Sequence, residues 1–286
     1  MNTTCPVCQS DFEKLYTIER FARPLSILYC PACGLQRQET FPPEEELYTE
    51  DYYQGRSEYS YRDERTTEKY DRFVWRARLK TIQRYRPPPA RLLDVGCAFG
   101  GFLGEAREAG YEVQGLDVSP YAAKSARERG LPVLQGSFGP GIFAPASFDV
   151  ISLVEVVEHL ADPLSFARSL FEYLRPGGLA LIQTANFLGQ QARRAGREYH
   201  YYLPGHLFYY SSRNLQQLLR GAGFDRFVLY RPVDFGLWPK LRKAAGNSGY
   251  RSWRRITMYH LKSKLAFRDF ALTSSMVLYA FKPELA

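Results

Sequence analysis

The chain has 286 residues, 45% of them hydrophobic and 24% charged, a composition typical of a globular protein that can bury a sizeable core. It contains no run of about 18 apolar residues, which argues against a membrane-spanning helix. The first residues lack the basic and apolar regions of a secretory signal peptide, so we expect a cytoplasmic protein.

The first 40 residues contain two Cys-x-x-Cys pairs, separated by 21 residues. Each pair can wrap one edge of a metal ion, and four thiolates form a tetrahedral shell suited to Zn²⁺. Disulfides or free thiols are the alternative, but disulfides are rare in the cytoplasm and the segment is too short to fold around its own core. We therefore predict a small zinc-ribbon module over residues 1–40, with one structural Zn²⁺ ion bound by Cys5, Cys8, Cys30 and Cys33.

Residues 41–89 are rich in tyrosine and form a predicted helical arm or cap. Apolar side chains recur at near-helical spacing from about residue 65 to residue 85, and the segment RPPPA then ends the helix. Some tyrosines of the arm could close over a pocket, although plain packing is the commoner role of such residues. These tyrosines are Tyr52, Tyr53, Tyr59 and Tyr61.

From residue 91 onward, predicted strands alternate with predicted helices, which indicates a parallel sheet with helices on both faces. The strands are expected at 91–95, 111–118, 132–136, 148–154 and 178–185, and the helices near 100–109, 120–129, 163–174 and 211–224. The segment LRPGG at 174–178 indicates a helix end followed by a turn. Two late strands, 225–233 and 274–283, have no crossover helix of their own and indicate an antiparallel pair at the sheet edge.

The first of these strands runs into a turn of small residues in RLLDVGCAFGGFL, residues 91–103. A dinucleotide-binding turn would follow G-x-G-x-x-G, and that pattern fails because Ala98 occupies the position of the second glycine. The segment instead follows D-x-G-x-A-x-G from Asp94 to Gly100. Together with GLDVS, GSF, FDVISLVEVVEHLADP and LRPGGLALIQT, it resembles the class I S-adenosylmethionine-dependent methyltransferases over residues 90–286.

This resemblance implies an α/β fold with a seven-stranded Rossmann-like sheet, an antiparallel last strand and S-adenosylmethionine as cofactor. In the family, the turn approaches the methionine part, an acid at the position of Asp117 accepts both ribose hydroxyls, and GSF lines the adenine. A carboxylate at the carboxyl end of a parallel strand also faces the ligand crevice on physical grounds. Its alternative role as a helix N-cap is already filled by Ser119. The expected cofactor residues are Asp94, Gly96, Cys97, Ala98, Gly100, Asp117, Val118, Gly136, Ser137, Phe138 and Leu153.

The accessory segments resemble a narrower group, the zinc-bearing sugar methyltransferases of antibiotic and cell-surface glycan pathways. Those enzymes combine a two-pair zinc module, a Tyr-rich arm and a histidine in a segment such as YYLPGHLFYYS, where this chain has His206. C-methylating members tend to carry an acid before that histidine and a long additional C-terminal domain. Here Gly205 precedes the histidine and that domain is missing from the sequence, so O- or N-methylation of a sugar-like or other small substrate is favoured.

Methyl transfer requires in-line alignment of the acceptor, and a base beside its hydroxyl adds further rate. His206 is the first candidate for this base, and Glu155 and His159 follow. The alternative for each is a structural role in packing or helix capping.

The positive charge of the chain is concentrated in a predicted insertion over residues 234–272. Residues 240–268 carry nine lysines and arginines and no acid, with tryptophans and leucines partly at helical spacing. Four interpretations of this segment are open: a solvated lid helix, a contact surface for an anionic membrane, a site for a phosphate-bearing substrate, or a nucleic-acid contact.

These observations predict a methyltransferase that acts on a hydroxyl, or on an amine or carbon, of a small polar substrate such as a sugar or glycan-pathway intermediate. An RNA-modifying methyltransferase is the alternative, with the zinc module and basic segment binding nucleic acid. The nearly balanced charge between the cysteine pairs argues against RNA. A scaffold with a vestigial site is disfavoured by the intact cofactor motif. The sequence leaves open the acceptor, the methylated atom and the oligomeric state.

Overall fold

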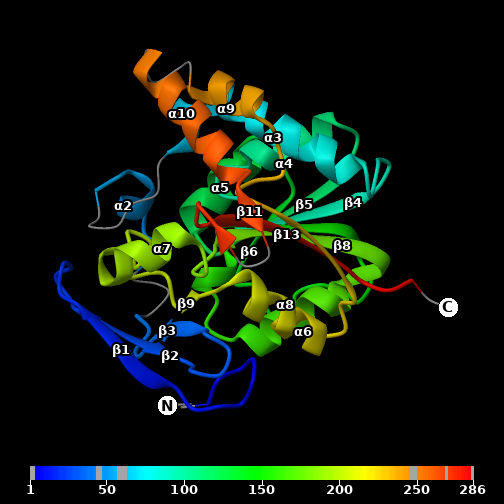
Figure 1. Ribbon diagram of the computed structural model, residues 1–286. Coiled ribbons are helices and arrows are strands. Elements are labelled where there is room, and N and C mark those ends of the chain that lie inside the picture. The colour runs from blue at the N-terminus through cyan, green and yellow to red at the C-terminus, as the bar shows by residue number, and fades with distance from the viewer. Residues whose placement is uncertain (1–3, 43–46, 57–62, 245–249, 268–269, 285–286) are drawn as a thin grey trace.

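The computed structural model describes residues 4–42, 47–56, 63–244, 250–267 and 270–284, with a seven-stranded sheet at its centre (Figure 1). The strand order is β10-β13-β8-β7-β4-β5-β6. The parallel strands are β4 (Arg91–Val95), β5 (Glu112–Asp117), β6 (Val133–Gln135), β7 (Phe148–Val154) and β8 (Leu174–Ala185). β13 (Ser275–Phe281) is antiparallel to β8 and to β10 (Arg226–Tyr230). The predicted α/β fold with an antiparallel last strand is confirmed.

Each face of the central sheet has its own apolar core, because successive residues of a strand point to opposite faces. Leu93 and Ile151 pack on one face with α6 (Pro163–Tyr173) and α8 (Ser212–Gly221). Leu92 and Val150 pack on the other face with α3 (Glu68–Gln83), α4 (Gly101–Glu108) and α5 (Pro120–Glu128). Figure 1 shows α6 and α8 on the opposite side of the sheet from α3 and α4. The ends of these helices lie within a few residues of the bounds expected from the sequence.

Residues 174–178, which were expected to form a helix end and a turn, have a different structure. α6 ends at Tyr173, and Leu174 already pairs with Phe148 as the first residue of β8. The register then shifts, because Pro176 lacks an N–H and Gly177 has a φ of +73°. The expected turn is therefore an irregular start of the strand.

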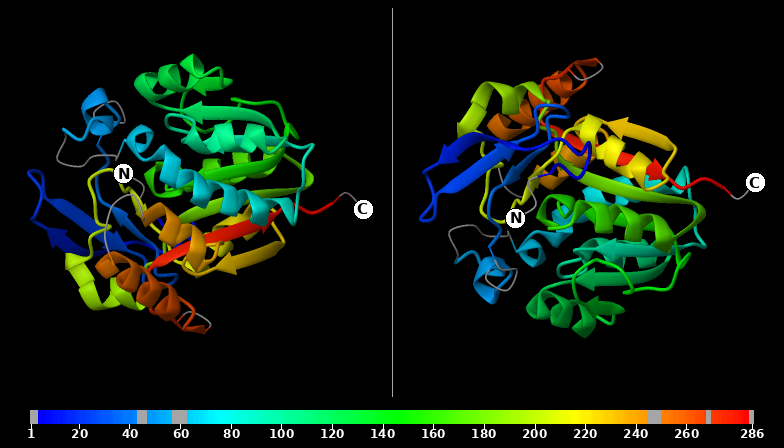
Figure 2. Two further views of the ribbon diagram at one scale, coloured as in Figure 1. Left: turned by 90° about the horizontal axis from the view of Figure 1, so that it is seen from above. Right: turned by 90° about the horizontal axis from the view of Figure 1, so that it is seen from below.

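The N-terminal module is a sheet in the order β1-β2-β3-β9. β1 (Glu13–Ile18), β2 (Leu25–Tyr29) and β3 (Gln36–Gln38) come from the module, whereas β9 (Phe208–Tyr209) comes from the α/β part of the chain. The views in Figure 2 show the blue strands of the module beside the central sheet, on the side away from the C-terminus. The module is thus joined to the loop that precedes α8 by strand pairing.

The remaining elements surround one end of the sheet. The arm contributes α2 (Glu50–Tyr53) and the 3-10 helix η1 (Glu64–Thr66), while Tyr59 and Tyr61 lie outside the described residues. After β8 come α7 (Gln190–Ala195) and the 3-10 helix η3 (Gly196–Glu198). The basic insertion forms α9 (Leu237–Ala244), which packs on α3, then α10 (Tyr250–Ser263), β11 (Ala266–Phe267) and β12 (Phe270–Ala271). In the described part of the chain, every helix is too short or too polar to cross a bilayer.

Candidate active site

A cavity of about 580 Å³ lies at the carboxyl ends of β4, β5 and β7, the edge at which parallel sheets bind ligands. It collects most of the predicted cofactor residues and all three candidate bases. These lining residues are Asp94, Gly96, Cys97, Ala98, Asp117, Val118, Gly136, Ser137, Phe138, Glu155, His159 and His206.

Two predicted cofactor residues lie outside this lining. Leu153 is completely buried in the core, and its neighbour Val154 lines the cavity in its place. Gly100 is the N-cap of α4 with a φ of +79°, and a Cβ added there would clash with the side chain of Leu131. Gly100 therefore permits the turn and the close packing of a helix, while its neighbours provide the cavity surface.

The turn after β4 is shaped by backbone conformations that favour glycine. Gly96 has a φ of +68°, and an added Cβ would lie 2.5 Å from the side chain of Val156. Ala98 also has a positive φ of 46°. Its N–H donates to Oδ2 of Asp117 over 2.8 Å, which stabilises the strained residue.

Asp117 is buried, and its carboxylate accepts N–H groups from both neighbouring loops. Oδ1 accepts from the backbone of Ser119 over 2.9 Å, and the hydroxyl of Tyr53 lies 3.4 Å away. Burial raises the pKa of Asp117, while these hydrogen bonds oppose the increase. The side chain of Ser119 caps α5, as predicted, so Asp117 is available to the cavity.

Asp94 is the second buried carboxylate of this wall. Its Oδ1 accepts a hydrogen bond from the Ser152 hydroxyl over 2.6 Å. Burial raises the pKa of Asp94 to about 7, since the hydrogen bond from Ser152 compensates only part of the desolvation. Its charge is therefore sensitive to a bound cation near neutral pH.

The opposite wall carries two histidines whose rings are 4.8 Å apart between centroids. Nδ1 of His159 lies 2.8 Å from the carbonyl oxygen of Gly205, and Nδ1 of His206 lies 2.8 Å from that of Tyr201. Because a carbonyl only accepts, Nδ1 carries the proton in each ring. Burial lowers the pKa of His159 to about 4 and that of His206 well below its usual range. Both imidazoles are therefore neutral at physiological pH.

Glu155 reaches the same cavity from the end of β7 and has a positive φ of 56°. Its Oε1 accepts a hydrogen bond from Gln183 over 2.7 Å. Gln183 in turn accepts from Arg78, which pairs with the buried carboxylate of Asp234 at 3.3 Å. This network fixes Glu155, and burial raises its pKa.

Sequence reasoning missed Arg78 and several other lining residues. Arg78 lies between Val74 and Ile82 on the apolar face of α3. An arginine at that helical spacing could have indicated a buried, functional side chain. The other missed residues gave no comparable signal, because they reach the cavity through tertiary packing. They include Tyr48, Trp75, Tyr201 and Lys243.

The arm covers the side of the cavity that is formed by the turn after β4. Tyr52 and Tyr53 are buried and pack on Ala98 and Phe99. Tyr48 lies edge-on to His159 with 5.9 Å between ring centroids. The expectation that arm tyrosines close over the pocket therefore fits Tyr52 and Tyr53.

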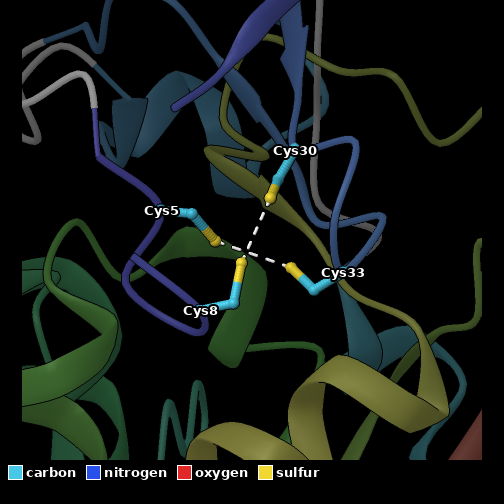
Figure 3. Close-up of side chains that lie close together, drawn as sticks. All are labelled: Cys5, Cys8, Cys30 and Cys33. Carbon is cyan, nitrogen blue, oxygen red and sulfur yellow. Dashed lines mark hydrogen bonds between the residues drawn. The ribbon is translucent and has the colours of Figure 1, made fainter. Parts of the chain in front are cut away.

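The four cysteines of the N-terminal module point toward one centre (Figure 3). Their sulfur atoms all lie within 4.8 Å of one another, with Cys5 and Cys33 at 3.5 Å and Cys8 and Cys30 at 3.3 Å. Thiolates on the corners of a zinc tetrahedron would be about 3.8 Å apart, given Zn–S bonds of about 2.3 Å. The donor set and its spacing fit a closed four-thiolate metal site.

The fold is an α/β methyltransferase fold with a cavity at the carboxyl ends of its parallel strands. The chain belongs to the methyltransferase domain family, whose model matches residues 63–227. It is similar to the ubiquinone biosynthesis O-methyltransferase of Ruegeria pomeroyi, with 42% identity over 103 residues, or 34% of this chain and 41% of that protein. The corresponding protein of a Caulobacter species is 33% identical over 156 residues, or 50% and 59%. The chain spans about half the length of these curated relatives.

Solved structures share the fold at low identity. Phosphoethanolamine N-methyltransferase 2 of Haemonchus contortus, in complex with S-adenosyl-L-methionine, is 17% identical with a TM-score of 0.54, covering 94% of this chain and 71% of that chain. A SAM-dependent methyltransferase of Archaeoglobus fulgidus is 20% identical with a TM-score of 0.52, covering 76% and 98%. The likeness concerns the fold alone.

Proposed function

We propose that this protein methylates a hydroxyl group of a small polar substrate, with a sugar or glycan-pathway intermediate as the acceptor class. The observation that carries the proposal is one cavity in which Asp117 and the turn after β4 face Glu155, His159 and His206. The O-methyltransferase names of the relatives support a hydroxyl acceptor, although those names concern ubiquinone biosynthesis. The sugar class rests on the sequence resemblance.

The first wall fits S-adenosylmethionine. Each oxygen of Asp117 accepts one backbone N–H and keeps further lone pairs, which suits the two hydroxyls of a ribose. The backbone of Gly96 lines the cavity, and the turn needs glycine there because an added Cβ would clash with Val156. When bound, the cofactor supplies an electrophilic methyl carbon. Asp94 would hold its amino group, and residues 136–138 would line its adenine.

The second wall would orient the acceptor and remove its proton. We assign the base to His206, whose neutral imidazole carries a lone pair on Nε2, with His159 and Glu155 beside it. Tyr52 and Tyr53 would exclude water from the cofactor side.

We also assign a structural Zn²⁺ ion to Cys5, Cys8, Cys30 and Cys33. Four thiolates complete the coordination of the metal, so no position is left for a reacting water or substrate. The ion would therefore hold the module together and take no part in methyl transfer.

Cofactor binding tests the first assignment directly. Calorimetric titration with S-adenosylmethionine should show binding to the wild type and a loss of roughly 10- to 100-fold in affinity for Asp117→Ala, since hydrogen bonds to charged groups contribute about 1.5–3 kcal/mol. Asp225→Asn, which changes an exposed aspartate outside the cavity lining, should bind as the wild type does. Equal affinities for Asp117→Ala and the wild type would remove Asp117 from the ribose site.

For the basic insertion, we propose contact with an anionic membrane surface, which would bring the cavity close to a lipid-linked acceptor. α9 and α10 carry exposed cations next to exposed apolar side chains such as Trp238 and Trp253.

A further inference from the structure

A second group of side chains with metal-ligand chemistry lies at the wall of the cavity, apart from the four cysteines. Glu158 and His159 end the 3-10 helix η2 (Val157–His159) after β7, and His206 lies in the loop before β9. One ligand atom from each residue lies within 4.8 Å of the others. The sequence separates these residues by nearly 50 positions, and the fold brings them together.

The two histidines have the protonation that metal binding requires. The carbonyl groups of Gly205 and Tyr201 fix the proton of each ring on Nδ1. The lone pair is then on Nε2, and metal-binding histidines commonly donate their other ring N–H to a carbonyl in this way. The two backbone carbonyls therefore hold His159 and His206 as ready ligands.

Glu158 supplies the independent observation. Its side chain is only 3% exposed, and neither carboxylate oxygen has a hydrogen-bond partner at ordinary geometry among the described residues. Burial and the neighbouring carboxylate of Glu155 raise the pKa of Glu158 well above its usual range. A buried carboxylate without a partner is costly, and such groups are normally paired or bound to a metal. The cluster therefore offers one buried carboxylate and two neutral nitrogen ligands, and no cation among the described residues pairs with that carboxylate.

We propose that Glu158, His159 and His206 bind one divalent transition-metal ion, such as Mn²⁺ or Zn²⁺, which holds the hydroxyl of the acceptor. This inference rests on the proposed function and deepens it. Two histidines and one carboxylate are a common ligand set for such ions and leave coordination positions open. Both histidines line the cavity, so the open positions would face the substrate.

The ion would take over the activation of the acceptor from His206. A hydroxyl bound to the ion loses its proton more easily, and the proton can pass through the carboxylate of Glu155 to solvent. The oxygen lone pair then forms the bond to the methyl carbon. The electron pair of the broken C–S bond stays on sulfur, which leaves as the neutral thioether of S-adenosylhomocysteine.

Manganese distinguishes this site from the cysteine site, because Mn²⁺ prefers oxygen and nitrogen ligands whereas thiolates select zinc. We would titrate the full-length, zinc-loaded protein with MnCl₂ and follow free Mn²⁺ by electron paramagnetic resonance. The wild type should bind one Mn²⁺ ion. His206→Ala and Glu158→Gln should each weaken that binding by at least about tenfold, in view of the 10- to 100-fold effects of even outer-shell changes.

His200→Gln is the matched control, since it removes a histidine of the same loop that lies outside the cluster. It should bind Mn²⁺ as the wild type does. A melting temperature that rises with Mn²⁺ in the wild type and not in Glu158→Gln would support the site independently of substrate. Folding of each variant is checked by its circular dichroism and its zinc content.

The inference fails if the wild type binds neither Mn²⁺ nor a second equivalent of Zn²⁺, or if Glu158→Gln and His206→Ala bind Mn²⁺ unchanged. Calorimetry with S-adenosylmethionine separates this failure from that of the proposed function. Cofactor binding without a second metal would leave the methyltransferase assignment intact and return His206 to the role of base. If the wild type bound neither S-adenosylmethionine nor a second metal ion, the proposed function itself would be contradicted.

Discussion

Asp94 and Asp117 are the two acids of the proposed cofactor wall, and both lie at carboxyl ends of neighbouring parallel strands. Each is buried, yet they differ in hydrogen bonding. Asp117 accepts two backbone N–H groups, whereas Asp94 accepts the hydroxyl of Ser152. Hydrogen bonds to the charged form offset desolvation, so the difference leaves Asp94 as the carboxylate poised to titrate near neutrality.

We predict that the affinity for S-adenosylmethionine increases from pH 6 to pH 8. The cofactor ammonium would favour the charged form of Asp94, so its pKa of about 7 should fall when the cofactor binds. Binding would then release a proton below pH 7. Above pH 7, where Asp94 is already charged, the affinity would no longer change with pH. Calorimetry in buffers of different ionisation enthalpy measures that proton. Asp94→Asn should bind more weakly and with a flat profile; a flat profile in the wild type would contradict the prediction.

The raised pKa of Asp94 also affects the free energy of unfolding, but with the opposite dependence on pH. The folded chain binds this proton more tightly than the unfolded chain, whose aspartate titrates near 3.9. The contribution of Asp94 to the free energy of unfolding should therefore decrease as the pH rises from about 4 to about 7 in the absence of cofactor.

At the level of elements, the N-terminal cysteine module and the loop that carries His206 are joined by strand pairing and hydrogen bonds. β3 pairs with β9, and the amide of Gln38 donates to the carbonyl oxygens of Leu203 at 2.8 Å and His206 at 2.9 Å. Cys5, Cys30 and Leu35 belong to the same core cluster as the central strands. The proposed boundary at residue 40 therefore divides segments that share a sheet and a core.

Local periodicity explains which elements could be predicted. The strands at β4, β5 and β7 and the helices α3 to α6 each carry enough apolar repeats to be recognised alone. β9 has two residues and pairs with a strand about 170 positions earlier, so no local pattern indicates it. The cysteine pairs could be recognised because ligand spacing is itself local, whereas Glu158, His159 and His206 meet only in the folded chain.

We predict that Cys30→Ser removes the zinc and lowers turnover more than it lowers cofactor affinity. Loss of the metal would loosen β3 and, through Gln38, the loop that carries His206, while Asp117 lies on the opposite wall. Metal analysis would measure the zinc content, a methyl-transfer assay the turnover, and calorimetry the affinity for S-adenosylmethionine. Cys97→Ser, which removes the cysteine outside the set, should keep its full zinc content. Unchanged zinc in Cys30→Ser would contradict the metal site.

Over the described surface of the molecule, exposed large hydrophobic side chains are concentrated in one segment. Eight large hydrophobic side chains are exposed in the described residues, and six of them lie between residues 238 and 265. They are Trp238, Trp253, Met258, Tyr259, Leu261 and Leu265. Exposed cations lie among them, including Arg254, Arg255, Lys262 and Lys264. An apolar patch ringed by one sign of charge is typical of an interaction surface.

The sequence indicated the charge of this segment but could not show which side chains are exposed. α9 packs on α3, and Lys243 pairs with Asp71 at 2.5 Å, so part of the segment is held against the body of the protein. The outer side of α10 keeps Trp253, 40% exposed, beside Arg254 and Arg255. This arrangement favours a membrane surface over a solvated lid, because a lid helix has no need for exposed tryptophan.

We therefore predict that the protein binds vesicles containing phosphatidylserine, and that binding weakens with salt. Each cation near an anionic surface contributes about 1 kcal/mol, and the exposed tryptophans add apolar contact. The double variant Arg254→Glu and Arg255→Glu should lose binding in a sedimentation assay, and Trp253→Ala should weaken it even in high salt. The control makes the same charge change on the opposite side of the sheet, at Arg168 and Arg213 of α6 and α8, and should bind as the wild type does. Equal binding of both double variants would show general electrostatic attraction, and structured RNA bound more tightly than vesicles would instead support an RNA substrate.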